Sequence, residues 1–324
     1  MSKQEQRQAI NSVKLVGEVK EHKLKLNKGK NDKGESFNYI NGSLVIKTGE
    51  FSEIEIGIYV TEKTKEDKTK KVFETLNAFI EEELLTLAGC KSAEDRDYVA
   101  KVRVFGNGDF QPHFKEDIFK IESGEVKTKI KMDLGFGTIS VDNSITEEDY
   151  KAEFEVEMYV SSVKEEEKDG EETGRVLITG WTPVYGGKVI PMEVIAGTIL
   201  DDDDSELDLA EDFRSQVEEG MTVNFWGEIN YKTIITKTTK GGGIGKAKVE
   251  EKKTYINELL LTGADIQEDE EKEFDAELIK KAKINRDNDI EEKKNAKDSG
   301  ESKGKGINKG SSSADKPKRD RPKF

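Results

Sequence analysis

Apolar and polar positions alternate with period two through most of the first 266 residues, starting at Val13 to Val19. Because successive side chains of a strand point to opposite faces, this alternation predicts β-strands with one buried face. Gly17 interrupts the first run and predicts a bend there. Further strands are expected at residues 24–26, 37–46, 54–60, 102–106, 118–121 and 126–141.

One segment between these strands has helical spacing. Residues 70–88 carry apolar side chains at intervals of three and four, among them Phe73, Leu76 and Phe79. Such a stripe predicts an amphipathic helix that closes one end of a β-barrel.

The same order of elements recurs after Tyr150. The pattern predicts strands at 154–163, 176–181 and 188–196, a short helix at 207–217, and strands at 220–229 and 254–261. Val102–Gly106 and Val223–Gly227 are locally similar, and each directly follows the helix of its half, which indicates an internal duplication. Three strands, a helix and two strands is the order of the OB-fold, a small barrel that binds oligonucleotides.

The predicted fold is therefore mainly β: two consecutive OB-like five-stranded barrels, each with one helix, and a disordered charged C-terminal tail. The expected limits are 10–145 and 150–266 for the barrels and 268–324 for the tail.

Charge separates the tail from the rest of the chain. The 324 residues carry a formal net charge of −15, with 37% charged and 33% hydrophobic residues. Residues 293–324 contain eleven Lys or Arg against four Asp or Glu, a net charge of +7, which leaves −22 on residues 1–292. The tail has too few apolar residues to offset its ordering entropy. The acidic body excludes binding to nucleic acid by bulk charge, so a polyanion has to meet local basic patches.

Catalytic and metal-binding residues are scarce. Cys90 is the one cysteine, and His22 and His113, both expected on the surface, are the two histidines. Asp201–Asp204 lacks the spacing of a calcium loop, and Gly241–Lys246 lacks the register of a phosphate loop. The chain is expected to be no enzyme, with no cofactor and no metal.

The N-terminus indicates a cytoplasmic protein, in the host cytoplasm if a phage encodes it. Residues 1–10 have no apolar signal-peptide core, and no run of about 18 apolar residues occurs that could enter a membrane. The lone cysteine fits a reducing compartment.

The opening strand carries a family resemblance. Residues Ile10 to Val19 contain an Asn-x-Val-x-Leu-x-Gly pattern from Asn11 to Gly17. This segment resembles the first strand of bacterial and phage single-stranded-DNA-binding proteins, which implies an OB-fold and binding of single-stranded DNA. Members of the bacterial type have one barrel and an acidic tail tip, whereas this chain ends in the basic segment Lys316–Phe324, so tail-mediated partner recruitment is not implied.

Basic hairpins with nearby aromatic residues form the predicted binding surface. Residues 13–48 contain eight Lys against four acids, and residues 231–253 contain seven Lys against two acids. Both stretches fall on loops with which an OB barrel tracks a phosphate backbone, while the aromatic rings can stack on bases. The predicted nucleic-acid-binding residues are Lys23, Lys25, Lys28, Lys30, Lys33, Phe37, Tyr39, Trp226, Tyr231, Lys232, Lys237, Lys240, Lys246, Lys248 and Tyr255.

Two interpretations of these residues remain open. In the first, Tyr39, Tyr231 and Tyr255 face the polar side of their strands and stack on bases, and the chain is a sequence-tolerant single-stranded-DNA-binding protein of phage replication or recombination. RNA is then a second candidate ligand, and replication or recombination proteins are candidate partners. In the second, Phe37, Phe225 and Trp226 are barrel core, the lysines keep the hairpins soluble, and the chain is a β-rich phage structural or protein-interaction module.

Overall fold

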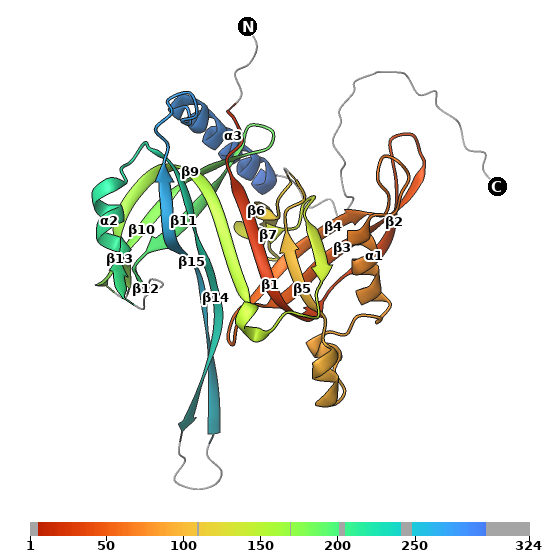
Figure 1. Cartoon of the computed structure of the whole chain (residues 1–324). Helices are drawn as coiled ribbons and strands as arrows, with labels where there is room; N and C mark the ends of the chain where they lie inside the picture. Colours follow the sequence, from red (N-terminus) through yellow and green to blue (C-terminus); the bar gives the residue numbers. More distant parts are fainter. Residues whose placement is uncertain (1–5, 109, 169, 201–204, 241–247, 296–324) are drawn as a thin grey trace, which may run out of the picture.

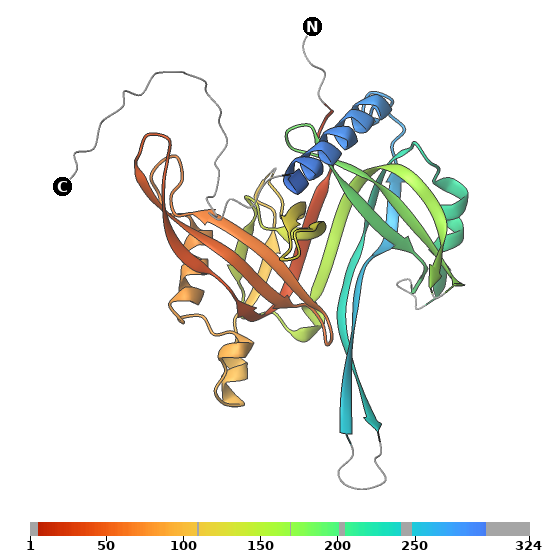
Figure 2. The same cartoon turned by 180° about the vertical axis from the view of Figure 1, so that it is seen from behind.

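The computed structural model describes residues 6–108, 110–168, 170–200, 205–240 and 248–295, with the backbone alone for Leu200, Ile235, 237–240 and 248–250. Two rings of strands lie side by side, and a helix lies across one end (Figures 1 and 2). The prediction of a mainly β chain built on a closed five-stranded barrel is confirmed. The expected tail residues 296–324 and the loops at 201–204 and 241–247 lie outside the described residues.

The N-terminal unit closes through antiparallel and parallel pairs. β1 pairs with β3, β3 with β4, β4 with β7 in parallel, and β5 with both β8 and β1. Since only residues 134–137 separate β7 from β8, these two strands complete the ring as one bent strand. The strands are β1 (Asn11–His22), β2 (Lys25–Lys30), β3 (Ser36–Lys47), β4 (Glu53–Thr61), β5 (Lys101–Phe105), β6 (His113–Lys120), β7 (Val126–Asp133) and β8 (Thr138–Val141).

A helix fills one end of this unit, as the apolar stripe predicts. α1 (Lys71–Ile80) buries Phe73, Leu76 and Phe79. It is shorter than the expected 70–88, because the chain turns after Ile80 and continues through two 3₁₀ turns, Leu87–Gly89 and Glu94–Tyr98.

The C-terminal unit repeats the pairing scheme. β9 pairs with β10, β10 with β11, β11 with β15 in parallel, β15 with β14, and β14 with β9. The strands are β9 (Lys151–Lys168), β10 (Glu171–Val184), β11 (Lys188–Ala196), β14 (Thr222–Lys240) and β15 (Lys248–Ile266), with the short pair β12 (Thr198–Leu200) and β13 (Glu206–Asp208) beside them. α2 (Leu209–Gln216) packs inward, with the rings of Phe213 and Phe225 6.0 Å apart.

The two rings share one sheet and one core. Residues 11–16 of β1 pair antiparallel with residues 151–156 of β9. A single cluster of buried residues runs from Val13 in one ring to Leu261 in the other. The division at 145–150 expected from the sequence therefore falls just before a strand that joins the two units, and the domain limits stay a prediction.

The segment after the second ring differs from the sequence-based expectation. Within the predicted tail 268–324, residues Ala276–Asn295 form the helix α3. Few apolar side chains hold it: Ile279 and Ala282 pack with Phe274 and Val189, and Trp181 lies against the same cluster. Arg286 adds an ion pair with Glu116 of β6. The composition of the segment did not reveal this helix because its apolar and ionic partners lie on distant strands.

Candidate nucleic-acid interface

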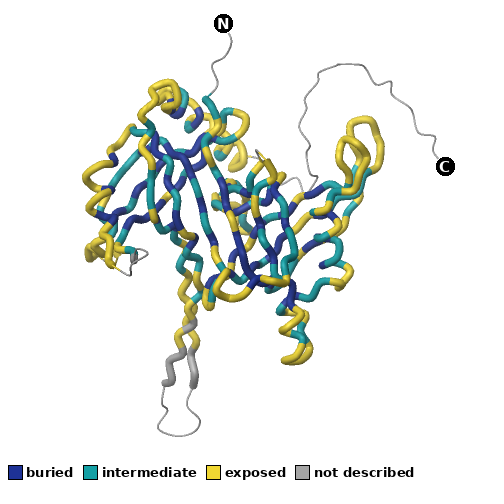
Figure 3. Tube along the Cα trace, in the orientation of Figure 1, coloured by how far each residue is buried: buried dark blue, intermediate teal, exposed yellow. Residues whose placement is uncertain are grey.

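A basic hairpin arm projects from the N-terminal unit. β2 pairs with the first half of β3, and the two strands extend beyond the ring, with their outer half exposed (Figures 1 and 3). The Asn31 side-chain oxygen closes the tip by accepting the backbone N–H groups of Lys33 and Glu35 at 3.0 and 2.9 Å. The tip is thus held by its own asparagine, a common use of this side chain in turns.

Four of the predicted lysines on this arm are free to meet phosphates. Their side chains are exposed, and among the described residues none has a carboxylate within ion-pair distance: Lys25, Lys28, Lys30 and Lys33. Lys23 differs, because its ammonium lies 4.0 Å from the Glu55 carboxylate. The arm therefore carries uncompensated positive charge on an otherwise acidic protein.

Three aromatic rings form a ladder on β3 and β4, on the face of the arm that Lys25 shares, whereas Lys28 and Lys30 lie on the other face. The ring centroids of Phe37 and Tyr39 lie 5.8 Å apart, and those of Tyr39 and Tyr59 lie 5.3 Å apart. Tyr59 is 55% exposed, and the other two rings are half-buried. Phe37 lies over Gly29, where a Cβ would stand 2.7 Å from the ring, so this position of the ring requires glycine. We call Phe37, Tyr39 and Tyr59 the aromatic ladder.

Tyr59 was absent from the sequence-based prediction. Alternation along residues 54–60 places Ile54, Ile56 and Ile58 in the core and Tyr59 outside, which the sequence contains. In the pairing of β3 with β4, Asn41 lies opposite Tyr59, which places Tyr59 diagonally beside Tyr39. This register depends on tertiary structure, so the sequence did not show that Tyr59 joins the other two rings.

The second predicted hairpin is a long ribbon of β14 and β15 that leaves the C-terminal unit. Tyr255 is 66% exposed on it and Lys232 is exposed. Tyr231 instead packs against the common core, where burial raises the pKa of its hydroxyl. The indole of Trp226 is half-buried over Gly263, where a Cβ would stand 2.6 Å from the ring. Phe225 lies in the core, which agrees with the second interpretation of the sequence.

Four predicted lysines of the ribbon cannot be placed. Lys246 lies outside the described residues, and so do the side chains of Lys237, Lys240 and Lys248. The arm and the ribbon leave the molecule in opposite directions (Figures 1 and 2).

The corresponding surface of the C-terminal unit has different chemistry. The hairpin of β9 and β10, equivalent to the basic arm, is rich in carboxylates, among them Glu165, Glu167, Glu171 and Glu172. On the outer side of β10, Trp181 lies under α3, with the Lys283 ammonium 4.7 Å and the Arg286 guanidinium 5.6 Å from its ring centroid. The acidic hairpin repels phosphates and the helix covers the ring.

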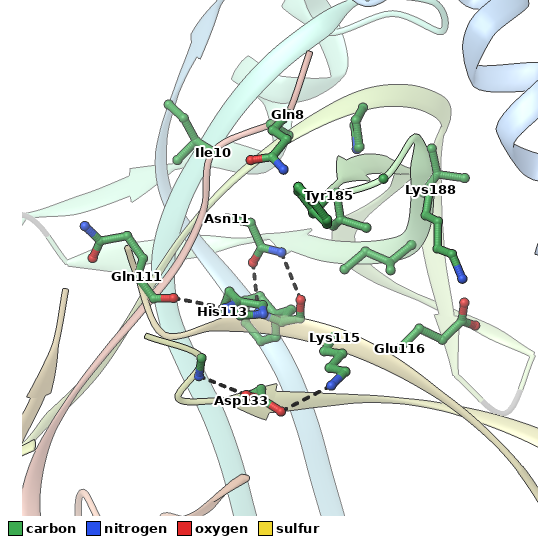
Figure 4. A pocket seen from close by; sticks show the side chains of 18 of the residues that line it. Gln8, Ile10, Asn11, Gln111, His113, Lys115, Glu116, Asp133, Tyr185 and Lys188 are labelled. Atoms are coloured by element: carbon green, nitrogen blue, oxygen red, sulfur yellow. Dashed lines mark hydrogen bonds and ion pairs between the residues drawn. The ribbon is translucent and has the colours of Figure 1, made fainter. Parts of the chain in front are cut away.

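A cleft of about 1270 Å³ lies between the units and is lined by residues of both and of α3. Its charged groups compensate each other: the Lys115 ammonium lies 3.5 Å from the Asp133 carboxylate (Figure 4), and that of Lys188 lies 3.3 Å from Asp289. His113 Nδ1 lies 3.0 Å from the Gln111 carbonyl oxygen. The cleft thus lacks the excess of cations that a phosphate backbone needs.

Both histidines are half-buried instead of exposed. His22 lies against the ring of Phe79, with centroids 6.2 Å apart, and His113 lines the cleft. No group of three or more His, Cys, Asp or Glu that could hold a metal is present among the described side chains. Within the described ranges, no helix combines the length and the apolar composition needed to cross a membrane.

Comparison with known proteins places the chain in a family. No curated protein matches it. Two solved structures of the single-stranded DNA binding protein from Thermus aquaticus, the wild type and a deletion mutant, are similar over 81% of this chain and 95% and 97% of theirs. Each has 10% sequence identity and a TM-score of 0.39, a similarity too low to carry an argument about function. The YorF family model matches residues 9–296, and the chain therefore belongs to the YorF family.

Proposed function

We propose that this chain binds single-stranded DNA, without strong sequence preference and without enzymatic activity, through the aromatic ladder and the lysines of the arm. The observation that carries the proposal is the position of three contacting rings, one of them 55% exposed, on an arm that also carries four exposed lysines in a protein of net charge −15. Rings stack on any base, and lysines neutralise the backbone that links the bases.

The chemistry of the site favours single strands over duplex. Stacking requires unpaired base faces, which a duplex hides within its own stack. Because the rings stack and make no base-specific hydrogen bonds, the site tolerates any sequence, as a protein of phage replication or recombination requires. RNA has the same base faces and phosphates, so it is the second ligand to test.

Salt-dependent binding of labelled oligo-dT, followed by fluorescence anisotropy, tests this function. Four lysine–phosphate contacts predict a slope of log affinity against log salt of about −3, at roughly −0.7 per contact on single strands. Changing Lys25, Lys28, Lys30 and Lys33 together to Gln should bring the slope close to zero for an oligomer of about 6 nucleotides, which is too short to reach lysines beyond the arm. The matched control carries the same charge change at exposed lysines remote from the ladder: Lys91, Lys164, Lys280 and Lys281.

Equal affinity for duplex and single strands, or a flat salt dependence in the wild type, would contradict the proposal. The alternative, a phage structural or protein-interaction module, predicts self-assembly or protein contacts with no affinity for oligo-dT. Sedimentation of the same samples separates these two functions.

A further inference from the structure

A turn of the N-terminal unit meets the ribbon of the C-terminal unit. The turn joins β3 to β4, and its Phe51 carbonyl accepts a hydrogen bond of 3.3 Å from the Thr233 N–H of β14. Ser52 forms an antiparallel bridge with Lys232. The turn is held in shape by Thr48, whose N–H donates to the Ser52 carbonyl at 3.0 Å and whose hydroxyl lies 2.9 Å from that of Ser52.

This contact places two exposed rings in one row. Because Ser52 is opposite Lys232, Phe51 is opposite Thr233, and Thr233 is in turn the cross-strand partner of Tyr255. Opposite residues of antiparallel strands point to the same face. With strands about 4.8 Å apart, the Cα atoms of Phe51 and Tyr255 lie about 10 Å from each other. The rings are 56% and 66% exposed.

Three exposed lysines of the ribbon lie near the rings of Phe51 and Tyr255. Lys232, Lys252 and Lys253 are exposed, and no carboxylate lies within ion-pair distance of them in the described part of the chain. Lys253 is two residues from Tyr255 on β15 and therefore shares its face. The acids nearby are Glu50, Glu251 and Glu53, and the last of these pairs with Lys20 at 2.6 Å.

The cleft, a second place where the two units meet, has rings but no excess charge. Tyr185, 86% exposed, lies in the turn between β10 and β11 and lines the cleft together with Phe110 and Phe136 of the N-terminal unit (Figure 4). Those two rings contact each other at 5.2 Å. Four cations line that cleft against four carboxylates, and three of the cations, Lys115, Lys188 and Arg286, form ion pairs.

We propose that Phe51 and Tyr255 form a second stacking subsite, at which single-stranded DNA bound on the aromatic ladder passes from the N-terminal unit onto the ribbon of the C-terminal unit. This inference rests on the proposed function. Phe51 lies in the turn before β4 and Tyr59 near the end of β4, about 26 Å apart at 3.3 Å per residue. A short oligonucleotide reaches the ladder alone, and a longer one reaches both places.

Oligo-dT of two lengths tests the subsite. Phe51→Ala and Tyr255→Ala should each weaken binding of an oligomer of about 20 nucleotides by about 5- to 140-fold, the range of one lost base stack. Binding of an oligomer of about 6 nucleotides, short for one OB unit, should stay unchanged. Tyr255→Phe keeps the ring and should keep the affinity. Tyr185→Ala is the matched control and should bind both lengths like the wild type.

Each outcome has a defined meaning. Unchanged affinity of Phe51→Ala and Tyr255→Ala for the long oligomer overturns the subsite while the ladder stands. An equal loss of affinity in Tyr185→Ala also overturns the subsite, because DNA would then bind equally at the cleft, which has no excess of positive charge. A change in sedimentation of the Phe51→Ala protein without loss of affinity assigns the two rings to contacts with a second copy of the chain. Failure of the wild type to bind either oligomer contradicts the proposed function itself.

Discussion

The side chain of Asn11 pairs with the backbone of Phe114 as a neighbouring strand would. Asn11 Nδ2 donates to the Phe114 carbonyl oxygen and the Phe114 N–H donates to Asn11 Oδ1, both at 2.9 Å (Figure 4). Phe114 lies on β6, the last strand of its sheet path, and its ring is 1% exposed. The amide thus ties the hairpin of β6 and β7 to β1, which gives the asparagine of the opening motif a structural role.

Replacing this asparagine should destabilise the protein without changing its fold. Asn11→Ala leaves a donor and an acceptor of Phe114 without their partner, at a cost of about 1–3 kcal/mol in free energy of unfolding. Urea unfolding followed by circular dichroism measures the change. Asn41→Ala removes an exposed amide that pairs with Asn27 at 2.8 Å, and as a control it should cost less than about 0.5 kcal/mol. Equal losses in the two variants would assign no special role to the contact with Phe114.

The tyrosines of the predicted site should separate into binding and core residues. Tyr59→Ala should weaken oligo-dT binding by about 1–3 kcal/mol and leave the melting temperature near that of the wild type, because the ring is 55% exposed. Tyr231→Ala should instead lower the free energy of unfolding by about 3 kcal/mol, since its ring packs on the core. Tyr98→Ala, at a ring 78% exposed and remote from the ladder, controls for loss of a surface tyrosine. Loss of affinity in Tyr98→Ala, or none in Tyr59→Ala, contradicts the ladder.

Gly17 is required by a close approach of two strands. At this residue one edge of β1 changes partner from β9 to β3, and a Cβ would stand 2.0 Å from the Lys47 carbonyl oxygen. Since the clash is with backbone, Gly17→Ala should destabilise the protein by more than about 2 kcal/mol or prevent folding. Gly49→Ala is the control, because its Cβ would meet Ser52 at an ordinary 3.5 Å. Similar thermal stability of the two variants would contradict the requirement.

Local sequence patterns predicted the strands and the first helix, but not which distant strands pair with each other. Alternation identified most strands of both rings, and helical spacing located α1; the core position of Phe225, open from the sequence, is decided by its burial. The pairing of β1 with β9 and the register that sets Tyr59 beside Tyr39 both join residues distant in sequence, so no window of residues contains them. Tyr231 was assigned to the polar face because strand alternation does not show that the ribbon begins inside the core.

The ion pair of Arg286 with Glu116 should anchor α3. Arg286 Nε lies 2.7 Å from a carboxylate oxygen of Glu116, and the two side chains are 15% and 6% exposed. Arg286→Met leaves the carboxylate buried without a partner, at a cost of about 3–5 kcal/mol. Replacing Glu116 by Leu in the same chain should recover part of this loss, because the buried charge is then gone.

Tryptophan fluorescence gives a local measure of the same change. The Arg286 guanidinium lies 5.6 Å from the Trp181 ring, so release of α3 should shift the emission of this tryptophan to longer wavelength in Arg286→Met. Trp226, the other tryptophan, lies on Gly263 away from α3 and provides a constant background. An unchanged spectrum together with wild-type stability would show that the ion pair does not hold the helix.

Acid stability should depend on Glu258. A hydrogen bond from Arg175 is the main cause that lowers the pKa of this carboxyl from 4.5 to about 2, with Lys168 also contributing. A carboxyl whose pKa is lower in the folded protein stabilises it above pH 4.5 and loses that contribution as the pH falls toward 2. Glu258→Gln should therefore melt about 2–4 °C lower at pH 7 for each kcal/mol lost, with the difference shrinking between pH 4.5 and pH 2. Glu219→Gln, at an exposed carboxylate, should melt like the wild type throughout. A difference between Glu258→Gln and the wild type that stays constant down to pH 2 would mean that packing, and not the charge on Glu258, accounts for the loss.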